Sequence, residues 1–186
     1  MFKDTLMRML SYGVAVDLGT VNTLIAIGGE GIVLKEPSTV AVSGENNLDI
    51  VAIGEDARDM LGRTPGGVSA IYPFRNGVIS DYGLAEAMLK YFIYKALGRR
   101  PSMLGVRTML CVPACITAVE KRALEDAAHG AGARDVYILD EGIAAAIGAG
   151  LSVTENVGSM IVDIGGGTTN AAIIAFGGVA ASSSVK

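Results

Sequence analysis

The sequence has no tryptophan, one histidine and two cysteines in its 186 residues. A Ser-His-Asp hydrolase needs a histidine beside its nucleophile, but His129 lies in an Ala-Ala-His-Gly-Ala-Gly segment that is typical of a helix C-terminus. We therefore expect a surface or capping role for His129. The chain lacks the further Cys and His ligands that a metal site around Cys111 and Cys115 would need, which indicates reduced, packed thiols in a cytosolic protein.

Positive charge and long apolar runs are also scarce. The formal net charge is −4 and the 15 basic residues form no dense run, so we expect no nucleic-acid partner. The longest apolar stretch near the C-terminus, 171–181, contains two glycines and is much shorter than the ~20 residues of a membrane span, which predicts no transmembrane helix. With 51% apolar residues and a mean hydropathy of +0.46, the chain is expected to form one large or two small globular domains.

The first eleven residues allow two interpretations. Apolar residues recur there at helical spacing and charged residues occupy the other face: Phe2, Leu6, Met9 and Leu10 against Lys3, Asp4 and Arg8. Residues 1–11 could therefore form an amphipathic helix on a membrane surface or a helix packed on the domain. The charges interrupt the apolar core too often for a signal peptide.

The most informative feature is a motif that occurs twice. Residues 14–20 read Val-Ala-Val-Asp-Leu-Gly-Thr, and residues 160–169 read Met-Ile-Val-Asp-Ile-Gly-Gly-Gly-Thr-Thr. In each copy a short apolar run predicts a buried strand, an aspartate closes it, and glycine and threonine make a tight turn before a second apolar run. Glycine lets the backbone approach a phosphate, successive N–H groups can bind an anion, and threonine hydroxyls add donors. The motif predicts two phosphate loops that share one nucleotide.

A single copy could be no more than a glycine turn with an acidic residue at a strand end, but the repetition argues against that interpretation. Two carboxylates, Asp17 and Asp163, would repel a polyphosphate and each other, so we expect a divalent cation between them, held through water if it is magnesium. Neither copy has the Gly-Lys-Ser/Thr of a Walker loop, and no stretch fits the Gly-x-Gly-x-x-Gly dinucleotide fingerprint.

The elements predicted between the two copies alternate strands and helices. Strands are expected at 13–18, 23–27, 31–35, 106–112 and 136–139, and helices at 84–97, from the Thr117 cap to Gly130, and at 143–150. Within 36–72 the signals are short and irregular, with strand candidates at 39–42 and 50–53 and a short helix at 55–61. We interpret this part as a small inserted subdomain.

These segments resemble the MreB family of bacterial actin homologues, within the actin, hexokinase and heat-shock chaperone superfamily. The resemblance covers essentially the whole chain and rests on residues 17–25, 60–66, 76–81, 144–151 and 158–169. It implies an α/β, actin-like (ribonuclease H-like) fold, with a mixed βββαβα sheet, flanking helices and an incomplete second half. The implied parts are a first large subdomain (12–35 and 73–152), the small subdomain (36–72) and the start of a second large subdomain (153–186).

The resemblance also implies a function. Family members are cytosolic, bind ATP with Mg²⁺, hydrolyse it slowly, and polymerise into paired filaments beneath the inner membrane that organise cell-wall synthesis in rod-shaped bacteria. The implied partners are other copies of the protein, the inner membrane surface and membrane proteins of cell-wall synthesis.

The resemblance assigns roles to particular residues. Phosphates would be bound by the two loops, through Gly19, Thr20, Val21 and Asn22 in the first and Gly165, Gly166, Gly167, Thr168 and Thr169 in the second. Asp17 and Asp163 would hold the magnesium shell, and Glu141 would orient or deprotonate the attacking water with help from Thr168. Without the resemblance, Glu141 would be read as a carboxylate stabilised by a helix N-terminus.

Three departures from the family stand out. Gly142 replaces a usual proline, Asn170 replaces a usual glutamate, and the sequence stops at Lys186, about halfway along the family pattern. Strands near Ile161, Ile164, Ile173, Ile174 and Phe176 would lose their covering helices, at a cost approaching ~10 kcal/mol. We therefore expect 1–152 to fold and 153–186 to be marginal, irregularly packed or covered by a partner.

Two other functions remain open at this point. A small-molecule phosphotransferase of the superfamily, such as a sugar or acetate kinase, would need a substrate-binding loop, and the sequence shows none. A non-catalytic interaction module would bind filament or wall-synthesis partners without turning over ATP.

Overall fold

The structure is a computed structural model that describes residues 13–44, 49–63, 67–75, 78–98, 105–114 and 116–185. The predicted N-terminal helix at 1–11 and Cys115 lie outside these residues. Within them, no helix combines the length and the apolar character needed to cross a bilayer.

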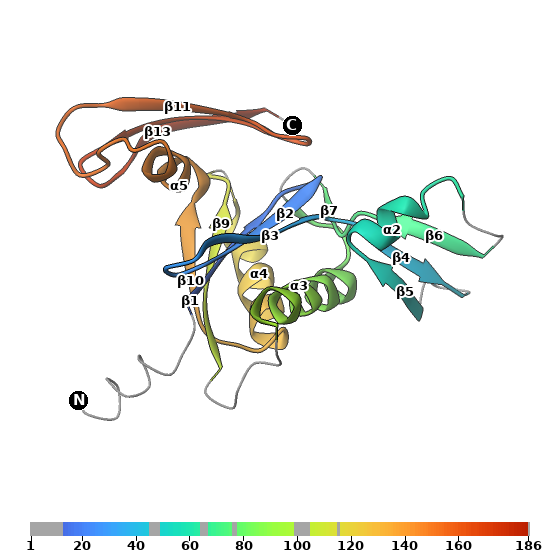
Figure 1. Cartoon of the computed structure of the whole chain (residues 1–186). Helices are drawn as coiled ribbons and strands as arrows, with labels where there is room; N and C mark the ends of the chain where they lie inside the picture. The colour runs from blue at the N-terminus through green and yellow to red at the C-terminus, as the bar shows by residue number, and fades with distance from the viewer. Residues whose placement is uncertain are drawn as a thin grey trace, which may run out of the picture.

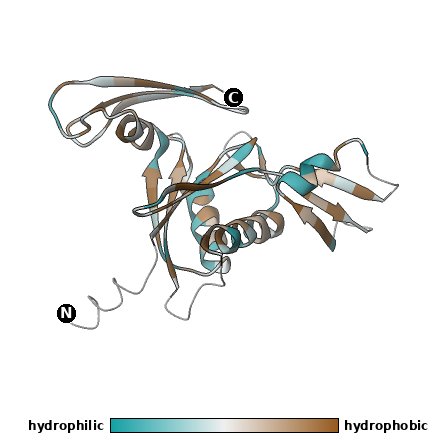
Figure 2. Ribbon diagram, viewed as in Figure 1, coloured by the Kyte–Doolittle hydropathy of each residue, from teal (hydrophilic) through white to brown (hydrophobic). Residues whose placement is uncertain are grey.

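A five-stranded mixed sheet forms the centre of the molecule, with strand order β10-β9-β1-β2-β3 (Figure 1). Its strands are β1 (Gly13–Leu18), β2 (Asn22–Ile27), β3 (Gly31–Pro37), β9 (Val106–Val112) and β10 (Ala133–Asp140). β1 runs antiparallel to β2 and parallel to β9, so a hairpin and a crossover meet at β1. Figure 2 shows apolar residues along these strands.

Two helices, α3 (Tyr82–Leu97) and α4 (Ala118–Gly130), cover one face of this sheet. Alternate residues of β1 point into the core, and Val16 and Ile25 are fully buried there together with Met88 and Phe92 of α3. Burial of each such side chain stabilises the fold by roughly 1.5–3 kcal/mol. This core leaves the opposite face of the sheet free to carry the site.

The caps of the two helices follow from their sequence. Asp81 Oδ1 accepts a hydrogen bond from Leu84 N at 3.0 Å where α3 begins, and α3 ends at Gly98 with φ +62°. The cap predicted at Thr117 is confirmed for α4 and forms a capping box, because Glu120 N donates to Thr117 Oγ1 and Thr117 N donates to Glu120 Oε2.

A second sheet, β5-β4-β6, lies beside the first with the short helix α2 (Glu55–Asp59). Its strands are β4 (Val40–Ser43), β5 (Asp49–Ile53) and β6 (Val68–Ile71), and a two-stranded hairpin, β7 (Phe74–Arg75) and β8 (Val78–Ile79), leads back towards α3. The buried carboxylate of Glu36 links the parts, since it accepts hydrogen bonds from Glu55 N at 2.9 Å and from Lys95 Nζ at 2.7 Å.

A three-stranded antiparallel sheet, β11 (Ser159–Ile164), β12 (Thr169–Ala175) and β13 (Gly178–Val185), ends the described chain. It lies over α5 (Glu141–Gly148), as Figure 1 shows. The three strands are hydrogen-bonded along their length, with one bulge between Ile173 and Ile174 where β12 pairs with β13. Ile174 is fully buried because α5 covers that face, whereas Ile164 and Phe176 are each 78% exposed.

The predicted elements differ from the structure mainly at their ends. β10 begins at Ala133, earlier than expected, because a bulge between Ala133 and Asp135 breaks the apolar alternation. α5 begins at Glu141 rather than at residue 143, since Asp140 provides the cap by accepting from Gly142 N at 2.8 Å. The sequence analysis did not predict β6, β7 and β8, which have two to four residues each and lie among turn residues.

Candidate functional site

The two copies of the motif meet at a cavity of about 240 Å³ between the large sheet and the β11-β12-β13 sheet. It is lined by Asp17, Gly19, Thr20, Val21, Asn22, Leu24, Lys35, Glu141, Asp163, Gly165, Gly166, Gly167 and Thr168. Every residue that the sequence analysis assigned to the site lines this cavity except Thr169, which is the first residue of β12. Segments nearly 150 residues apart in the chain (163 − 17 = 146) therefore form one site.

The two loops approach each other through glycine. A Cβ on Gly166 would overlap the side chain of Val21, and a Cβ on Gly167 would lie 2.6 Å from Thr20 Oγ1. The second loop closes on itself, because Gly165 N donates to the Thr168 carbonyl at 2.9 Å. Loops this close leave backbone N–H groups and threonine hydroxyls facing one small space, which suits a phosphate chain.

The first loop is held from behind by Ser38, which sequence analysis did not identify. Ser38 Oγ donates to the Gly19 carbonyl at 2.7 Å and shares a 2.9 Å hydrogen bond with Thr23 Oγ1. Both Ser38 and Thr23 are fully buried, so these bonds are shielded from water. A serine just after a strand end carries no distinctive signal, which is why it was missed.

Negative charge dominates the floor of the cavity. Burial, and secondly the charge of Asp163, raise the pKa of Asp17. Burial also raises the pKa of Glu141 to about 7, with further contributions from Asp17, Asp163 and Asp140. Burial, followed by the charges of Asp17, Glu141 and Asp140, raises the pKa of the Cys111 thiol to about 12, so this free cysteine stays protonated at neutral pH. Carboxylates that repel one another in this way attract a cation.

The donor set fits a hard divalent cation whose remaining ligands come from water or phosphate. Among the described residues, no cluster of three or more His, Cys, Asp or Glu side chains is arranged to hold a metal. Asp17 and Asp163 line the cavity together with Glu141, and magnesium commonly binds through one or two carboxylates while it keeps several waters.

Glu141 stands at the first position of α5 and points towards β12. Its Oε2 accepts a hydrogen bond from Asn170 Nδ2 at 3.0 Å, and Ser184 Oγ donates to Asn170 Oδ1 at 2.6 Å. The sequence analysis treated Asn170 only as a departure from the family, and it did not identify Ser184.

Lys35 and Leu24 also line the cavity and were not expected there. Strand register explains their position, because Asp17 pairs with Leu24 and Leu24 pairs with Lys35 across the sheet. Directly paired residues share a face, so Lys35 brings a positive charge to the face that carries Asp17. Knowledge of the register of β3, which the sequence did not provide, would have identified Lys35.

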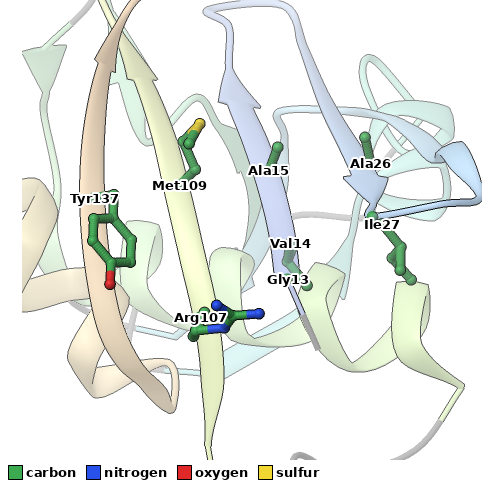
Figure 3. Close-up of a pocket in the computed structure, with 9 residues that line it drawn as sticks. Gly13, Val14, Ala15, Ala26, Ile27, Arg107, Met109 and Tyr137 are labelled. Atoms are coloured by element: carbon green, nitrogen blue, oxygen red, sulfur yellow. The ribbon is translucent and has the colours of Figure 1, made fainter. Parts of the chain in front are cut away.

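A larger cavity of about 570 Å³ lies farther along the same face (Figure 3). Its lining is mainly apolar and includes Ala15, Ala26 and Met109, with Arg107 and Tyr137 as the polar side chains. It contains no residue of either glycine loop and no carboxylate, so it lacks the groups that phosphate and magnesium require. The smaller cavity is therefore the candidate site.

Comparison with known proteins identifies the family. A sequence model described as MreB/Mbl protein matches residues 11–186. The chain is 49% identical to cell shape-determining protein MreB of Escherichia coli (strain K12) over 181 residues, which is 96% of this chain and 52% of that protein. It is 47% identical to cell shape-determining protein Mbl of Bacillus subtilis (strain 168), covering 96% of this chain and 53% of that protein. The chain thus spans about half the length of the curated relatives it matches.

Solved structures show the same fold. MreB5 of Spiroplasma citri bound to ADP superposes with a TM-score of 0.85 at 36% identity, covering 95% of this chain and 52% of that one. The same protein bound to AMPPNP gives a TM-score of 0.84. The MamK double helical filament gives 0.74 at 22% identity, covering 94% of this chain and 54% of that one. The actin-like fold that the resemblance implied is confirmed, and the chain belongs to the MreB/Mbl family.

Proposed function

We propose that this chain carries the phosphate- and magnesium-binding side of an ATP-dependent, actin-like protein that determines cell shape. The observation that supports this most strongly is the convergence of both Asp-Gly-Thr loops on one cavity. The names of the relatives given above and the ADP and AMPPNP bound to MreB5 point to the same function.

In this proposal the two loops bind the phosphates of ATP. Backbone N–H groups and hydroxyls of Gly19, Thr20, Val21 and Asn22 approach from one side, and those of Gly165, Gly166, Gly167, Thr168 and Thr169 approach from the other. Lys35 adds a positive charge at the rim of the carboxylate cluster. Asp17 and Asp163 are the residues that would hold magnesium, through water. Magnesium, when bound, neutralises phosphate charge and lets the two carboxylates stay ionised.

Glu141 is the proposed general base. Its carboxylate lines the cavity, and its pKa of about 7 suits a group that accepts a proton from water at neutral pH. Thr168 lies in the second loop at the same cavity and helps to place that water. Slow hydrolysis is part of this proposal, as the resemblance to the family implies.

At the level of the cell, we propose self-association into filaments on the inner face of the cytoplasmic membrane, with membrane proteins of cell-wall synthesis as partners. The fold shared with MreB5 and with the MamK filament supports self-association. We also propose residues 12–35 with 73–152, 36–72 and 153–186 as the subdomains, and residues 1–11 as the membrane-binding segment.

Calorimetry with magnesium-ATP tests the proposed site. We expect micromolar binding by the wild-type chain and its loss in Asp163→Ala. Asp49→Ala is the matched control, because Asp49 is exposed on β5 and does not line the cavity. Absence of binding in all three proteins would contradict the proposal and would favour the non-catalytic interaction module. The comparisons do not favour a small-molecule phosphotransferase.

A further inference from the structure

Asn170 occupies a position at which it bridges the second sheet and the proposed catalytic carboxylate. It lies on β12 directly between Asp163 of β11 and Ser184 of β13 in the strand register. Its side chain is turned towards α5, and the residue is only 8% exposed. A buried primary amide needs partners for its oxygen and its NH₂ group, and here each finds one: Ser184 and Glu141.

The two hydrogen bonds fix the direction of the amide. Ser184 Oγ donates to Asn170 Oδ1 at 2.6 Å, which directs the NH₂ group towards Glu141 Oε2 at 3.0 Å. The reversed amide would place its oxygen against a carboxylate oxygen, so it would be repelled whenever Glu141 is ionised. Among the described residues, no protein group donates to Oε1 of Glu141, and this oxygen stays available for water.

Close backbone packing sets the distance between these residues. Gly142, the next residue of α5, lies against β12 so tightly that a Cβ there would come within 2.8 Å of the Ala172 Cβ. Ala172 is two residues from Asn170 and on the same face of the strand. Gly142 and Asn170 therefore act together: the glycine lets α5 lie close to β12, and at that distance Asn170 can reach Glu141.

We propose that Asn170, oriented by Ser184, is a positioning residue that holds Glu141 with Oε2 bound and Oε1 directed to the attacking water. The inference rests on the proposed function for its consequence in catalysis, and on the two hydrogen bonds for its geometry. An amide donor favours the ionised carboxylate that a general base requires. A glutamate at position 170 would instead add a negative charge beside Asp17, Asp163 and Glu141.

A first experiment tests the contact without nucleotide or turnover. The side-chain NH₂ signal of Asn170 is followed by ¹H–¹⁵N NMR in the full chain. We expect it to shift in Glu141→Gln and in Ser184→Ala, and to stay in place in Ser182→Ala. Ser182 is the matched control because it lies on the same strand, two residues away, and pairs with Ala172 rather than Asn170. An Asn170 NH₂ signal whose chemical shift is the same in Glu141→Gln and in wild type would overturn the proposal.

A second experiment tests the consequence. Phosphate release from magnesium-ATP is measured for Asn170→Ala, and we expect kcat to fall about tenfold with little change in ATP affinity, as for loss of one hydrogen bond to a charged group. In Asn170→Asp, which keeps the shape but replaces the donor by an acceptor, kcat should fall further. In a Glu141→Gln background, Asn170→Ala should have no added effect. Independent, additive losses would contradict the positioning role.

The two experiments separate the two proposals. A wild-type chain that neither binds nor hydrolyses ATP would contradict the proposed function, while the NMR signal would still decide whether Asn170 holds Glu141. A chain that hydrolyses ATP at the same rate in wild type and Asn170→Ala would leave the proposed function standing and refute the role of Asn170.

Discussion

Gly166 lies against Val21 so closely that any side chain at position 166 would overlap the valine side chain. The contact joins the second phosphate loop to the first, across the two sheets that carry the repeated motif. The glycine is therefore required by the neighbouring loop as well as by the phosphate.

Gly166→Ala should separate the two loops. Because the added methyl group cannot be accommodated beside Val21 without moving one loop, we expect affinity for magnesium-ATP to fall by about tenfold or more. Calorimetry measures the affinity. Gly148→Ala is the control, since a Cβ at Gly148 has nothing within 4 Å and that residue is exposed on α5. Equal affinity of Gly166→Ala and wild type would show that the loops do not need this contact.

Glu141 should make stability fall as pH rises. Its pKa is raised from 4.5 to about 7 in the folded chain, chiefly by burial, so the folded state holds a proton that the unfolded state releases between these values. The buried carboxyl therefore does not lower the free energy of unfolding below pH 4.5, and it lowers that free energy by the full amount above about pH 7. Glu141→Gln should therefore match wild type near pH 4 and be more stable by about 1–2 kcal/mol near pH 8, after allowance for partial solvent exposure.

Urea unfolding in magnesium-free buffer at the two pH values measures this difference. Glu155→Gln is the control because Glu155 is exposed. Stability that is equally pH-dependent in wild type and Glu141→Gln would show that other groups are responsible. Added magnesium should reduce the effect, since a cation near Asp17 and Asp163 favours the ionised form of Glu141.

The repeated motif made much of this site predictable. Both loops and both aspartates could be assigned because the chemistry of phosphate binding restricts the residue types, and strands such as β1 and β9 have clear alternation or apolar character. Glu141 could be assigned only through the resemblance to the family. The sequence could not assign Lys35, Ser38 and Ser184 to the site, since each reaches it through strand register or a tertiary hydrogen bond. Such pairings depend on residues far apart in the sequence, and local patterns do not encode them.

Gly54 should be far more sensitive to substitution than Gly29. Both have positive φ, +77° and +87°, so alanine is strained at either position. Only at Gly54 would the Cβ also overlap the Glu36 carboxylate and come 3.1 Å from the Phe92 ring, whereas nothing lies within 4 Å at Gly29. We expect Gly29→Ala to cost about 1 kcal/mol and Gly54→Ala about 2 kcal/mol more. Thermal or urea unfolding checks this, and equal losses would show that Glu36 moves freely.

The β11-β12-β13 sheet should open more easily than the central sheet. Among the helices that the structure describes, α5 covers its face where Ile174 is buried, and the other face of the sheet exposes Met160 and Ile164 at 63% and 78%. Native-state hydrogen exchange should therefore give the Ile173 amide a lower opening free energy than the Leu110 amide, by at least ~2 kcal/mol. Ile174→Ala should increase this difference in opening free energy by about 2–4 kcal/mol, because it leaves a cavity. Ile164→Ala should change the difference little, because Ile164 is exposed and its truncation leaves no cavity. Equal protection of Ile173 and Leu110 would instead mean that both sheets unfold in one cooperative step, and that α5 alone is enough to bind them together.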